Sequence, residues 1–280
     1  MTLNILTESG IGDRLLDIWS AICIMQNQNK ECKELNVVVP NNNHTHDQTG
    51  YFDNIHIPGC KLNVVLKPGG PIPPNSIPSL NRWGTTTPEK IHSLCNHKTI
   101  EEISESYKQI AKTTVINNIE CDWAKDYVGI HVRRGDKLHY DKSIPVSWEM
   151  NLDYANRLHD VLIKYVNTFL PDAKLLVVGD DYEYMEKLSK CFSNETYIQK
   201  GNAIEDFKTL SKCKSIIQAT KYSTFSMAAS IMGGVEIMNF NDILKGPKTF
   251  WTWEHALKVP SNIELVNVLF KNENIKVVIS

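Results

Sequence analysis

The chain has 280 residues, and its 30 Lys and Arg residues nearly balance its 32 Asp and Glu residues. This length can bury one large core or two cores of ordinary size. The formal net charge of −2 argues against a broad surface for nucleic acid or anionic membranes, so we expect neither partner, and any anion must be bound locally by a few cations.

The sequence is typical of a cytoplasmic protein. Its seven cysteines are scattered and form no C-x-x-C pair, which indicates reduced thiols rather than a disulfide framework or a structural zinc site. The first ten residues lack the basic start and apolar run of a signal peptide. No apolar stretch approaches the roughly 20 residues needed to span a bilayer. We therefore expect a cytoplasmic location and no membrane span.

The first part of the chain mixes strands and helices. Leu3–Leu6 is a short apolar run, and Arg14–Met25 carries apolar residues at helical spacing, with the Gly-containing loop Glu8–Asp13 between them. The other elements predicted here are strands at Leu35–Val39, Ile55–Ile57 and Leu62–Leu66, an irregular proline-rich segment at Pro68–Pro78, and a helix at Thr99–Ala111.

In the second part, strands and helices alternate regularly. The predicted strands are Tyr127–Val132, Lys174–Val178, Thr196–Ile198, Ser215–Gln218 and Val235–Met238. The predicted helices are Leu152–Leu170, Tyr182–Cys191, Ile204–Lys212 and Met227–Met232. Such alternation predicts an α/β fold with parallel sheets. We expect two Rossmann-like domains, residues 1–120 and 121–250, and a segment 251–280 that packs back toward the first.

Four predicted strand ends carry polar residues, where ligands of open α/β sheets bind. They are Gly10–Arg14, His131–Lys137, Gly179–Asp181 and Ser223–Ser226. Two of them, His131–Lys137 and Ser223–Ser226, suit a phosphate. Arginine pairs with phosphate through its planar fork, and hydroxyls at a helix N-terminus form an anion site.

Each of these motifs also has a purely structural explanation. Arg-Arg-Gly-Asp is common in solvated turns, and Ser-Thr-Phe-Ser can be a helix cap with a core phenylalanine. Asp180 and Asp181 can cap the following helix, and Gly10-x-Gly12 is a weak signal by itself. The order of the four motifs along the chain favours a ligand site over these alternatives.

The segment His131-Val132-Arg133-Arg134-Gly135-Asp136-Lys137 resembles the H-V-R-R-[GT]-D motif of the fucosyltransferase superfamily of glycosyltransferases, which has GT-B architecture. Gly10–Arg14, Val177–Asp181 and Asp206–Cys213 followed by Ser223–Ser226 resemble further motifs of that group in the same order. The resemblance implies a GT-B-like fold, with two Rossmann-like domains facing across a cleft, and an inverting transfer from a nucleotide sugar.

The resemblance also implies roles for single residues. Arg133 would bind the donor β-phosphate and stabilise the leaving diphosphate, Arg134 would brace that loop, and Lys137 would add charge. The full set of implied donor-binding residues is Gly12, His131, Arg133, Arg134, Lys137, Gly179, Asp180, Asp181, Asp206, Ser223, Thr224, Phe225 and Ser226. The implied acceptor-side residues are Gly10, Asp13 and Arg14.

Two carboxylates are candidates for the catalytic base. Asp141 falls where core fucosyltransferases carry a catalytic glutamate, whereas Asp13 lies on the loop that would face the acceptor. Asp141 could instead be a solvated turn residue, and Asp13 could cap the helix predicted from Arg14. We favour Asp13, because an inverting transferase needs its base on the acceptor side. No metal is expected, since the chain lacks Asp-x-Asp and cationic side chains can neutralise the diphosphate.

The donor and the acceptor are less constrained than the reaction type. Met227-Ala228 replace the residues that usually follow the Thr-Phe-Ser run, so the base pocket need not read guanine. In general character the chain resembles glycosyltransferases that chloroviruses encode for capsid glycans. That likeness implies UDP-xylose as donor, a fucose of a viral capsid N-glycan as acceptor, and the host cytosol as location.

Several alternatives stay open. The donor could be GDP-fucose, the chain could be a non-catalytic nucleotide- or sugar-binding protein, and a homodimer is compatible with the sequence. A phosphotransferase is disfavoured by the lack of a G-x-x-x-x-G-K-[ST] loop.

Overall fold

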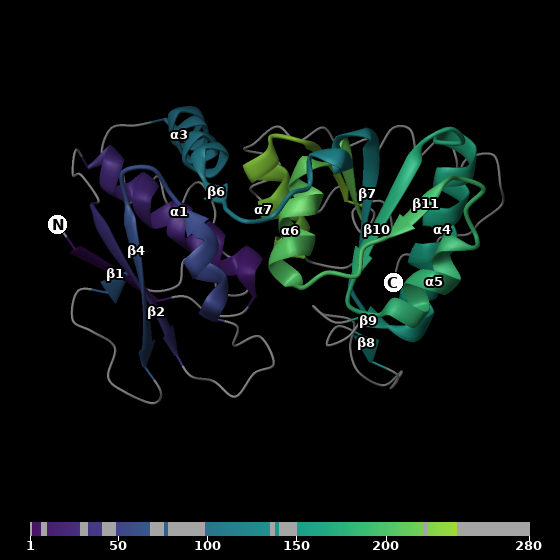
Figure 1. Cartoon of the computed structure of the whole chain (residues 1–280), viewed down its shortest axis with the longest axis horizontal. Helices are drawn as coiled ribbons and strands as arrows, with labels where there is room; N and C mark the ends of the chain where they lie inside the picture. The colour runs from purple at the N-terminus through teal and green to yellow at the C-terminus, as the bar shows by residue number, and fades with distance from the viewer. Residues whose placement is uncertain are drawn as a thin grey trace. The chain divides into compact units, whose positions relative to one another are not determined.

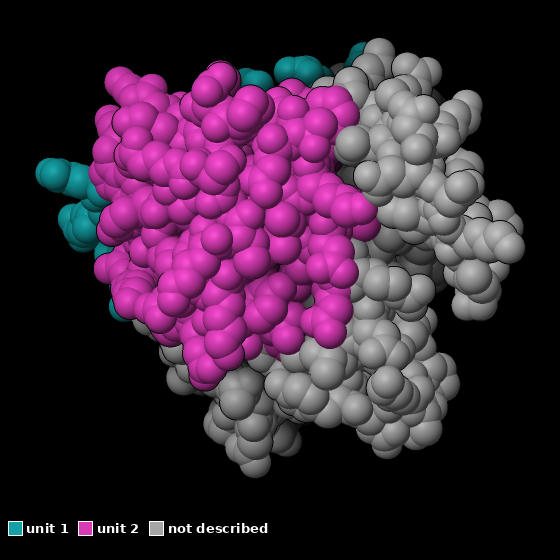
Figure 2. Space-filling model, turned by 90° about the vertical axis from the view of Figure 1, so that its right-hand side faces the viewer, with its two compact units in different colours: residues 1–120, 227–234, 250–259 teal, residues 121–226, 235–249, 260–280 magenta. Residues whose placement is uncertain are grey.

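The computed structural model describes residues 2–6, 10–28, 33–40, 49–67, 76–77, 99–134, 138–139, 150–220 and 223–239. Its contacts divide the chain into two compact units, coloured teal and magenta in Figure 2. Unit 1 holds the described residues up to 120 together with residues 227–234, and unit 2 holds the described residues of 121–226 and 235–239.

Unit 1 is built on a parallel sheet with the strand order β4-β2-β1-β5 (Figure 1). Its strands are β1 Thr2–Leu6, β2 Glu34–Pro40, β4 Lys61–Lys67 and β5 Ser76–Ile77. The helices are α1 Ile11–Asn27 and α3 Ile100–Thr113, with a 3-10 turn, η1, at Thr49–Asn54. Two short strands, β3 Ile55–His56 and β6 Val115–Ile116, pair antiparallel in a separate two-stranded sheet.

A buried tryptophan joins the two helices of unit 1. Trp19 of α1 is fully buried, and its ring packs edge-on against Tyr107 of α3 with centroids 5.9 Å apart. The indole N–H donates to Thr114 Oγ1 at 2.9 Å, just beyond the end of α3. Large buried aromatic side chains contribute strongly to core stability when their polar atom is also satisfied, as it is here.

Unit 2 is built on a five-stranded parallel sheet with the order β11-β10-β7-β12-β13. Its strands are β7 Tyr127–Val132, β10 Lys174–Gly179, β11 Thr196–Ile198, β12 Ser215–Gln218 and β13 Glu236–Asn239. The helices are α4 Leu152–Phe169, α5 Tyr182–Ser189, α6 Ala203–Lys212 and α7 Thr224–Gly233, whose residues from 227 on belong to unit 1. A 3-10 turn, η3 Asp122–Asp126, precedes β7, and β8 Leu138–His139 pairs with β9 Met150–Asn151.

The central strand β7 is covered on both faces. Val128, Ile130 and Val132 belong to a core cluster that includes residues of α4 and α5. On the opposite face, a Cβ added at Gly129 would lie 2.8 Å from Leu210 Cδ2 and 2.9 Å from Cys213 Sγ. Alternate residues of a strand point to opposite faces, so α4 covers one face of β7 and α6 the other. His131 therefore shares the α6 face.

The predicted α/β class is confirmed, and most element boundaries agree within a few residues. Three predictions need correction. Helix α1 begins at Ile11 with Gly10 as its N-cap, so Asp13 lies in its first turn and is no cap. Helix α7 begins at Thr224, inside the Ser223–Ser226 motif. The proline-rich segment contains the short strand β5. Segment 251–280 lies outside the described residues.

Candidate active site

The strand order of unit 2 reverses at β7. The chain runs outward from β7 through β10 to β11, and then returns to the other side through β12 to β13. Ligands of such sheets bind in the crevice beyond the carboxyl ends at this reversal. Two hydrogen bonds join the ends of β7 and β12: Ala219 N–H donates to His131 O at 2.9 Å, and Thr220 Oγ1 donates to Arg133 O at 3.1 Å. The predicted arginine pair thus lies at the expected place in the sheet.

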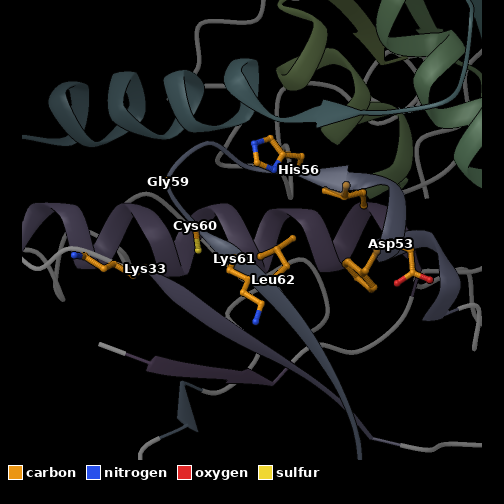
Figure 3. Close-up of a pocket in the computed structure, with 9 residues that line it drawn as sticks. Lys33, Asp53, His56, Gly59, Cys60, Lys61 and Leu62 are labelled. Atoms are coloured by element: carbon orange, nitrogen blue, oxygen red, sulfur yellow. The ribbon is translucent and has the colours of Figure 1, made fainter.

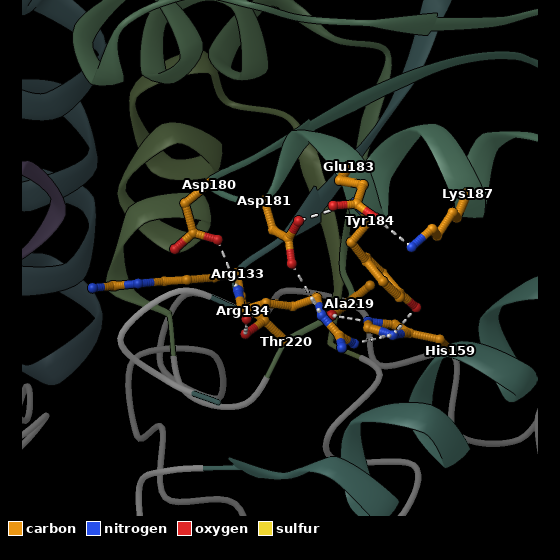
Figure 4. Close-up of polar contacts among 10 residues, drawn as sticks. All are labelled: Arg133, Arg134, His159, Asp180, Asp181, Glu183, Tyr184, Lys187, Ala219 and Thr220. Atoms are coloured by element: carbon orange, nitrogen blue, oxygen red, sulfur yellow. Dashed lines mark hydrogen bonds and ion pairs between the residues drawn. The ribbon is translucent and has the colours of Figure 1, made fainter. Parts of the chain in front are cut away.

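Arg134 is buried and held on several sides (Figure 4). Its backbone N–H donates to Asp180 Oδ1 at 2.8 Å, and its guanidinium carbon lies 3.7 Å from the centroid of the Tyr184 ring. Its Nε lies 3.6 Å from Asp181 Oδ2, which is an ion-pair distance rather than a hydrogen bond. Its Nη1 lies 3.4 Å from Nδ1 of His159. These contacts fit the bracing role implied for Arg134.

Arg133 points the other way. In Figure 4 its side chain extends away from the cluster around Arg134, although the two residues are adjacent. Arg133 is half-buried, and its charge is near enough to His131 to help lower the pKa of that ring. Because its carbonyl is held by Thr220 and its neighbour by Asp180, the backbone at Arg133 is fixed from both sides.

His131 is a buried, neutral ring at the same sheet edge. Burial, and secondly the charge of Arg133, lower its pKa to about 3. The ring stacks on Phe225 with centroids 5.0 Å apart, and Phe225 in turn packs edge-on against Phe207 of α6. Nδ1 of His131 has no hydrogen-bond partner among the described residues. Buried polar atoms usually have a partner, so this atom suits a ligand or a water.

Two further buried polar groups, one at the end of β12 and one just before α7, lack a complete set of partners among the described residues. Gln218 is 1% exposed and accepts from Ser226 Oγ at 2.7 Å, but its Nε2 has no partner among the described residues. Ser223 Oγ, just before α7, has none there either. Buried donors rarely stay unsatisfied, so these atoms and His131 Nδ1 fit a site whose ligand supplies polar atoms. Backbone N–H groups of the first turn of α7 add to its affinity for anions.

The strand end Gly179–Asp181 shapes the arginine loop. A Cβ at Gly179 would lie 2.0 Å from Val132 O, so only glycine lets β10 approach β7 this closely. Asp181 caps α5 by accepting from Tyr184 N–H at 3.0 Å, as the structural alternative predicts, and also pairs with Arg134. Both acidic residues therefore contact the loop after β7.

Asp206, in the first turn of α6, is 6% exposed. Burial first, and then the charge of Glu205, raise its pKa to about 7, while a hydrogen bond from Gly201 N–H opposes the shift. Its Oδ1 has no hydrogen-bond partner within the part of the chain that the structure describes. The carboxyl group is therefore partly protonated near neutral pH and can donate as well as accept.

The predicted acceptor-side residues Gly10, Asp13 and Arg14 lie together at the start of α1 in unit 1, and the predicted donor-binding residue Gly12 lies among them. Gly10 is the N-cap, Gly12 and Asp13 are in the first turn, and Arg14 follows at 3% exposure. They come after β1, at the carboxyl edge of that unit's sheet. Asp13 is half-buried there. Of the other predicted site residues, Lys137 and Asp141 lie outside the described residues.

Unit 1 also contains a hollow of about 620 Å³ near the amino ends of β2 and β4 (Figure 3). Lys33, Asp53, His56 and Lys61 are among its lining residues. This edge of the sheet is opposite to the one that carries Gly10–Arg14, because the strands are parallel. The hollow is therefore separate from the predicted acceptor residues.

Neither a metal cluster nor a membrane helix is found in the part of the chain that the structure describes. Within those ranges, no three or more His, Cys, Asp or Glu side chains are grouped so that they could hold a metal ion. No helix there is both long and apolar enough to cross a bilayer. Independence from metal remains a prediction.

Sequence reasoning missed four residues of this edge: His159, Tyr184, Gln218 and Thr220. His159 and Tyr184 lie within helices whose amphipathic pattern draws attention to apolar residues. Gln218 ends an apolar strand, and a polar residue at the carboxyl end of a buried strand was the available signal.

Solved structures similar to the chain have low identity to it. They include the fucosyltransferase NodZ from Bradyrhizobium (14% identity, 86% of this chain and 96% of that chain, TM-score 0.48). The heptosyltransferase WaaC of E. coli (10%, 85% and 86%, 0.44) and a glycosyl transferase family 9 protein of Veillonella parvula (11%, 90% and 83%, 0.46) are further examples.

Comparison with curated protein sequences gave no match. A family match does exist: residues 90–257 match the family described as Glycosyl transferase family 11. The matched range contains the arginine pair, the acidic strand end, Asp206 and the Ser223–Ser226 motif. Because the match covers more than half of the 280 residues, this chain belongs to glycosyl transferase family 11 and is a glycosyltransferase that uses a nucleotide-sugar donor.

Proposed function

We propose that the chain transfers a sugar from a nucleotide-sugar donor to a glycan hydroxyl, with inversion at the anomeric carbon and without a metal ion. The observation that carries this proposal is Arg133 at the carboxyl end of the central strand, with its backbone held by Thr220 and its neighbour by Asp180. A guanidinium on a fixed backbone at a strand-order reversal suits a diphosphate, because its planar fork pairs with two phosphate oxygens.

In the proposed reaction, the acceptor hydroxyl attacks the anomeric carbon while the bond to the diphosphate breaks. Negative charge then develops on the leaving β-phosphate, and Arg133 stabilises it. The N-terminus of α7, with Ser223 and Thr224, would add backbone donors to the phosphate. Charges that are fixed before the reaction stabilise the transition state without reorganising. Lys137 would add a second cation.

The base that deprotonates the acceptor hydroxyl is proposed to be Asp13, with Asp141 as the rival. Asp13 is half-buried in the first turn of α1 and follows a strand end of unit 1, which supports a ligand-facing position. Gly10 and Arg14 would line the acceptor beside it. A carboxylate on the acceptor side leaves the opposite face of the sugar to the diphosphate, as inversion requires.

For the donor we propose UDP-xylose first and GDP-fucose second, with a fucose of a viral capsid N-glycan as the acceptor of xylose. The departure from the fucosyltransferase pattern at Met227-Ala228 supports a base other than guanine. GDP-fucose is supported by the H-V-R-R-G-D motif itself, which resembles that of fucosyltransferases. Gln218 Nε2 and Ser223 Oγ, which have no partner within the described ranges, fit either nucleotide.

The test is a donor panel with the purified chain in EDTA. Release of nucleoside diphosphate is measured with UDP-xylose, UDP-glucose, GDP-fucose and GDP-mannose, each with and without a fucose-terminated oligosaccharide. Acceptor-dependent release of UDP from UDP-xylose, with a product of inverted configuration by NMR, supports the proposal. If nucleoside diphosphate is released from GDP-fucose and from none of the other three donors, GDP-fucose is the donor. Turnover that disappears in EDTA and returns with manganese contradicts the metal-free mechanism.

A further inference from the structure

His159, on α4, contacts the loops that follow two different strands. Its Nε2 lies 3.3 Å from the carbonyl oxygen of Ala219, after β12, and its Nδ1 lies 3.4 Å from Arg134 Nη1, after β7 (Figure 4). The residue is only 2% exposed. One buried side chain thus touches both sides of the strand-order reversal.

The contacts require one tautomer of the ring. A carbonyl only accepts, so Nε2 of His159 carries the hydrogen, and a guanidinium only donates, so Nδ1 accepts. The O–H of Tyr184 shares this acceptor with Arg134, because Nδ1 has a single lone pair. Burial raises the pKa of Tyr184 to about 12, so that hydroxyl keeps its proton. Burial, and secondly the charge of Arg134, lower the pKa of His159 to about 4, so the ring is neutral near pH 7.

No other described contact of Arg134 reaches the β12 side. Asp181 and the ring of Tyr184 both come from α5 or its cap. On the β12 side, Ala219 is followed directly by Thr220, whose hydroxyl holds the carbonyl of Arg133. By holding Ala219, the His159 ring therefore also holds Thr220, which bonds the carbonyl of Arg133.

We propose that His159 is a positioning residue for the donor diphosphate. It bonds Arg134 through Nδ1 and Ala219 through Nε2, and so fixes the backbone of Arg133 against Thr220. The proposal rests on the proposed function, in which Arg133 binds the leaving diphosphate. His159 itself touches no substrate in this role.

Two substitutions of His159 each keep one of its two hydrogen bonds, to Arg134 or to Ala219, and remove the other. The amide of His159→Asn reaches the position of Nδ1, so that variant can accept from Arg134 but cannot reach Ala219. The longer amide of His159→Gln reaches the position of Nε2, so it can donate to Ala219 but loses the bond to Arg134. Asn167→Ala is the matched control. This change removes the hydrogen bond that Asn167 donates to Cys191 O (3.0 Å) and the one that it accepts from Ser193 N–H (3.3 Å). Asn167 is on the same helix as His159, α4, but away from the carboxyl ends of the strands.

Each variant is compared with the wild type and with Arg133→Ala. The measurements are the melting temperature, kcat and KM for donor and acceptor per folded molecule, and the Kd for UDP and GDP by titration calorimetry. We expect both His159 variants to lose about 10- to 100-fold in kcat for the donor reaction, because small displacements of a charged group are costly to catalysis. The acceptor KM should not change, and Asn167→Ala should match the wild type.

Wild-type kcat and nucleotide affinity in folded His159→Asn and His159→Gln, with Arg133→Ala impaired, would overturn the positioning role and leave the proposed function standing. Losses that vanish after correction for the folded fraction would do the same. If Arg133→Ala is as active as the wild type, the proposed role of Arg133 fails instead, and the inference fails with it. A wild type that binds neither UDP nor GDP contradicts both.

Discussion

Asp180 accepts a hydrogen bond from the backbone N–H of Arg134 at 2.8 Å, so the carboxyl end of β10 fixes the backbone that follows β7. The next residue, Asp181, pairs with the side chain of the same arginine. The Asp-Asp pair that the resemblance assigns to donor binding is thus also a brace for the loop that carries Arg133.

The first prediction concerns the oxygen of Asp180. Asp180→Ala leaves the Arg134 N–H without an acceptor, and we expect a loss of about 10- to 100-fold in kcat/KM for the donor, because an unsatisfied buried donor costs about 1–3 kcal/mol. Asp180→Asn keeps an acceptor oxygen and should stay within roughly threefold of the wild type. Steady-state kinetics and melting curves check both variants. Equal losses in the two would mean that the charge of Asp180 matters, and not its hydrogen bond.

The second prediction concerns the approach of β10 to β7. A Cβ at Gly179 would lie 2.0 Å from Val132 O, and a backbone oxygen cannot move aside. Gly179→Ala should therefore lower the free energy of unfolding by about 3 kcal/mol or more. Gly10→Ala is the matched control, because no atom lies within 4 Å of its Cβ position, and it should cost less than about 1 kcal/mol. Urea unfolding measures both, and similar losses would contradict the close approach.

The sequence predicts the sheet of unit 2 well, because its apolar runs are bounded by polar turns and its helices are amphipathic. Tyr127–Val132 and Ser215–Gln218 were predicted with the boundaries that the structure has. The start of α1 was not, because Gly10 and Gly12 are typical of a loop, yet the helix begins at Ile11. Strand β5 was missed because prolines surround it.

The candidate site was predicted only in part, for a physical reason. Arg133, Arg134 and Asp180 follow strands, so their place at one sheet edge can be read from the sequence. His159 and Tyr184 come from the middle and the first turn of helices, and only tertiary packing brings them to Arg134. Sequence spacing carries no information about such contacts between helices.

The third prediction concerns stability in acid. The pKa values of His131 and His159 are lowered from 6.5 to about 3 and about 4, mainly by burial. The unfolded chain therefore binds protons that the folded chain does not as the pH falls below about 6.5, and folding becomes less stable toward pH 4. Each histidine should lower the free energy of unfolding by about 2 kcal/mol when the pH falls from 7 to 5. The raised pKa of Asp206 acts in the opposite direction throughout this range, because the folded chain holds a proton on this carboxyl between about pH 7 and pH 4 that the unfolded chain does not.

The test compares His159→Gln with the wild type, which cancels the contribution of Asp206. The variant lacks the titrating ring, so its unfolding free energy should gain about 2 kcal/mol relative to the wild type between pH 7 and pH 5. Chemical unfolding at the two pH values gives this difference directly. A constant difference would mean that His159 is as easily protonated in the folded chain as in the unfolded one.

The fourth prediction concerns the base. We expect Asp13→Asn to lose about 10²- to 10⁴-fold in kcat, as removal of a general base does, and Asp141→Asn to stay near the wild type. Rates are measured at saturating donor and acceptor. The reverse result would assign the base to Asp141. Turnover that survives in both variants would mean that no protein carboxylate of this pair acts as a base.

The central claim is that Arg133 stabilises the departing diphosphate, and substitution of that one side chain tests it most directly. In Arg133→Ala, kcat should fall by about 10²- to 10³-fold, the range found when a preorganised charge-stabilising donor is removed. The melting temperature should not change, because the buried brace is Arg134 and not Arg133. Arg133→Lys should recover only part of the rate, since lysine lacks the two-pronged fork. A folded Arg133→Ala variant with the kcat of the wild type would contradict the account.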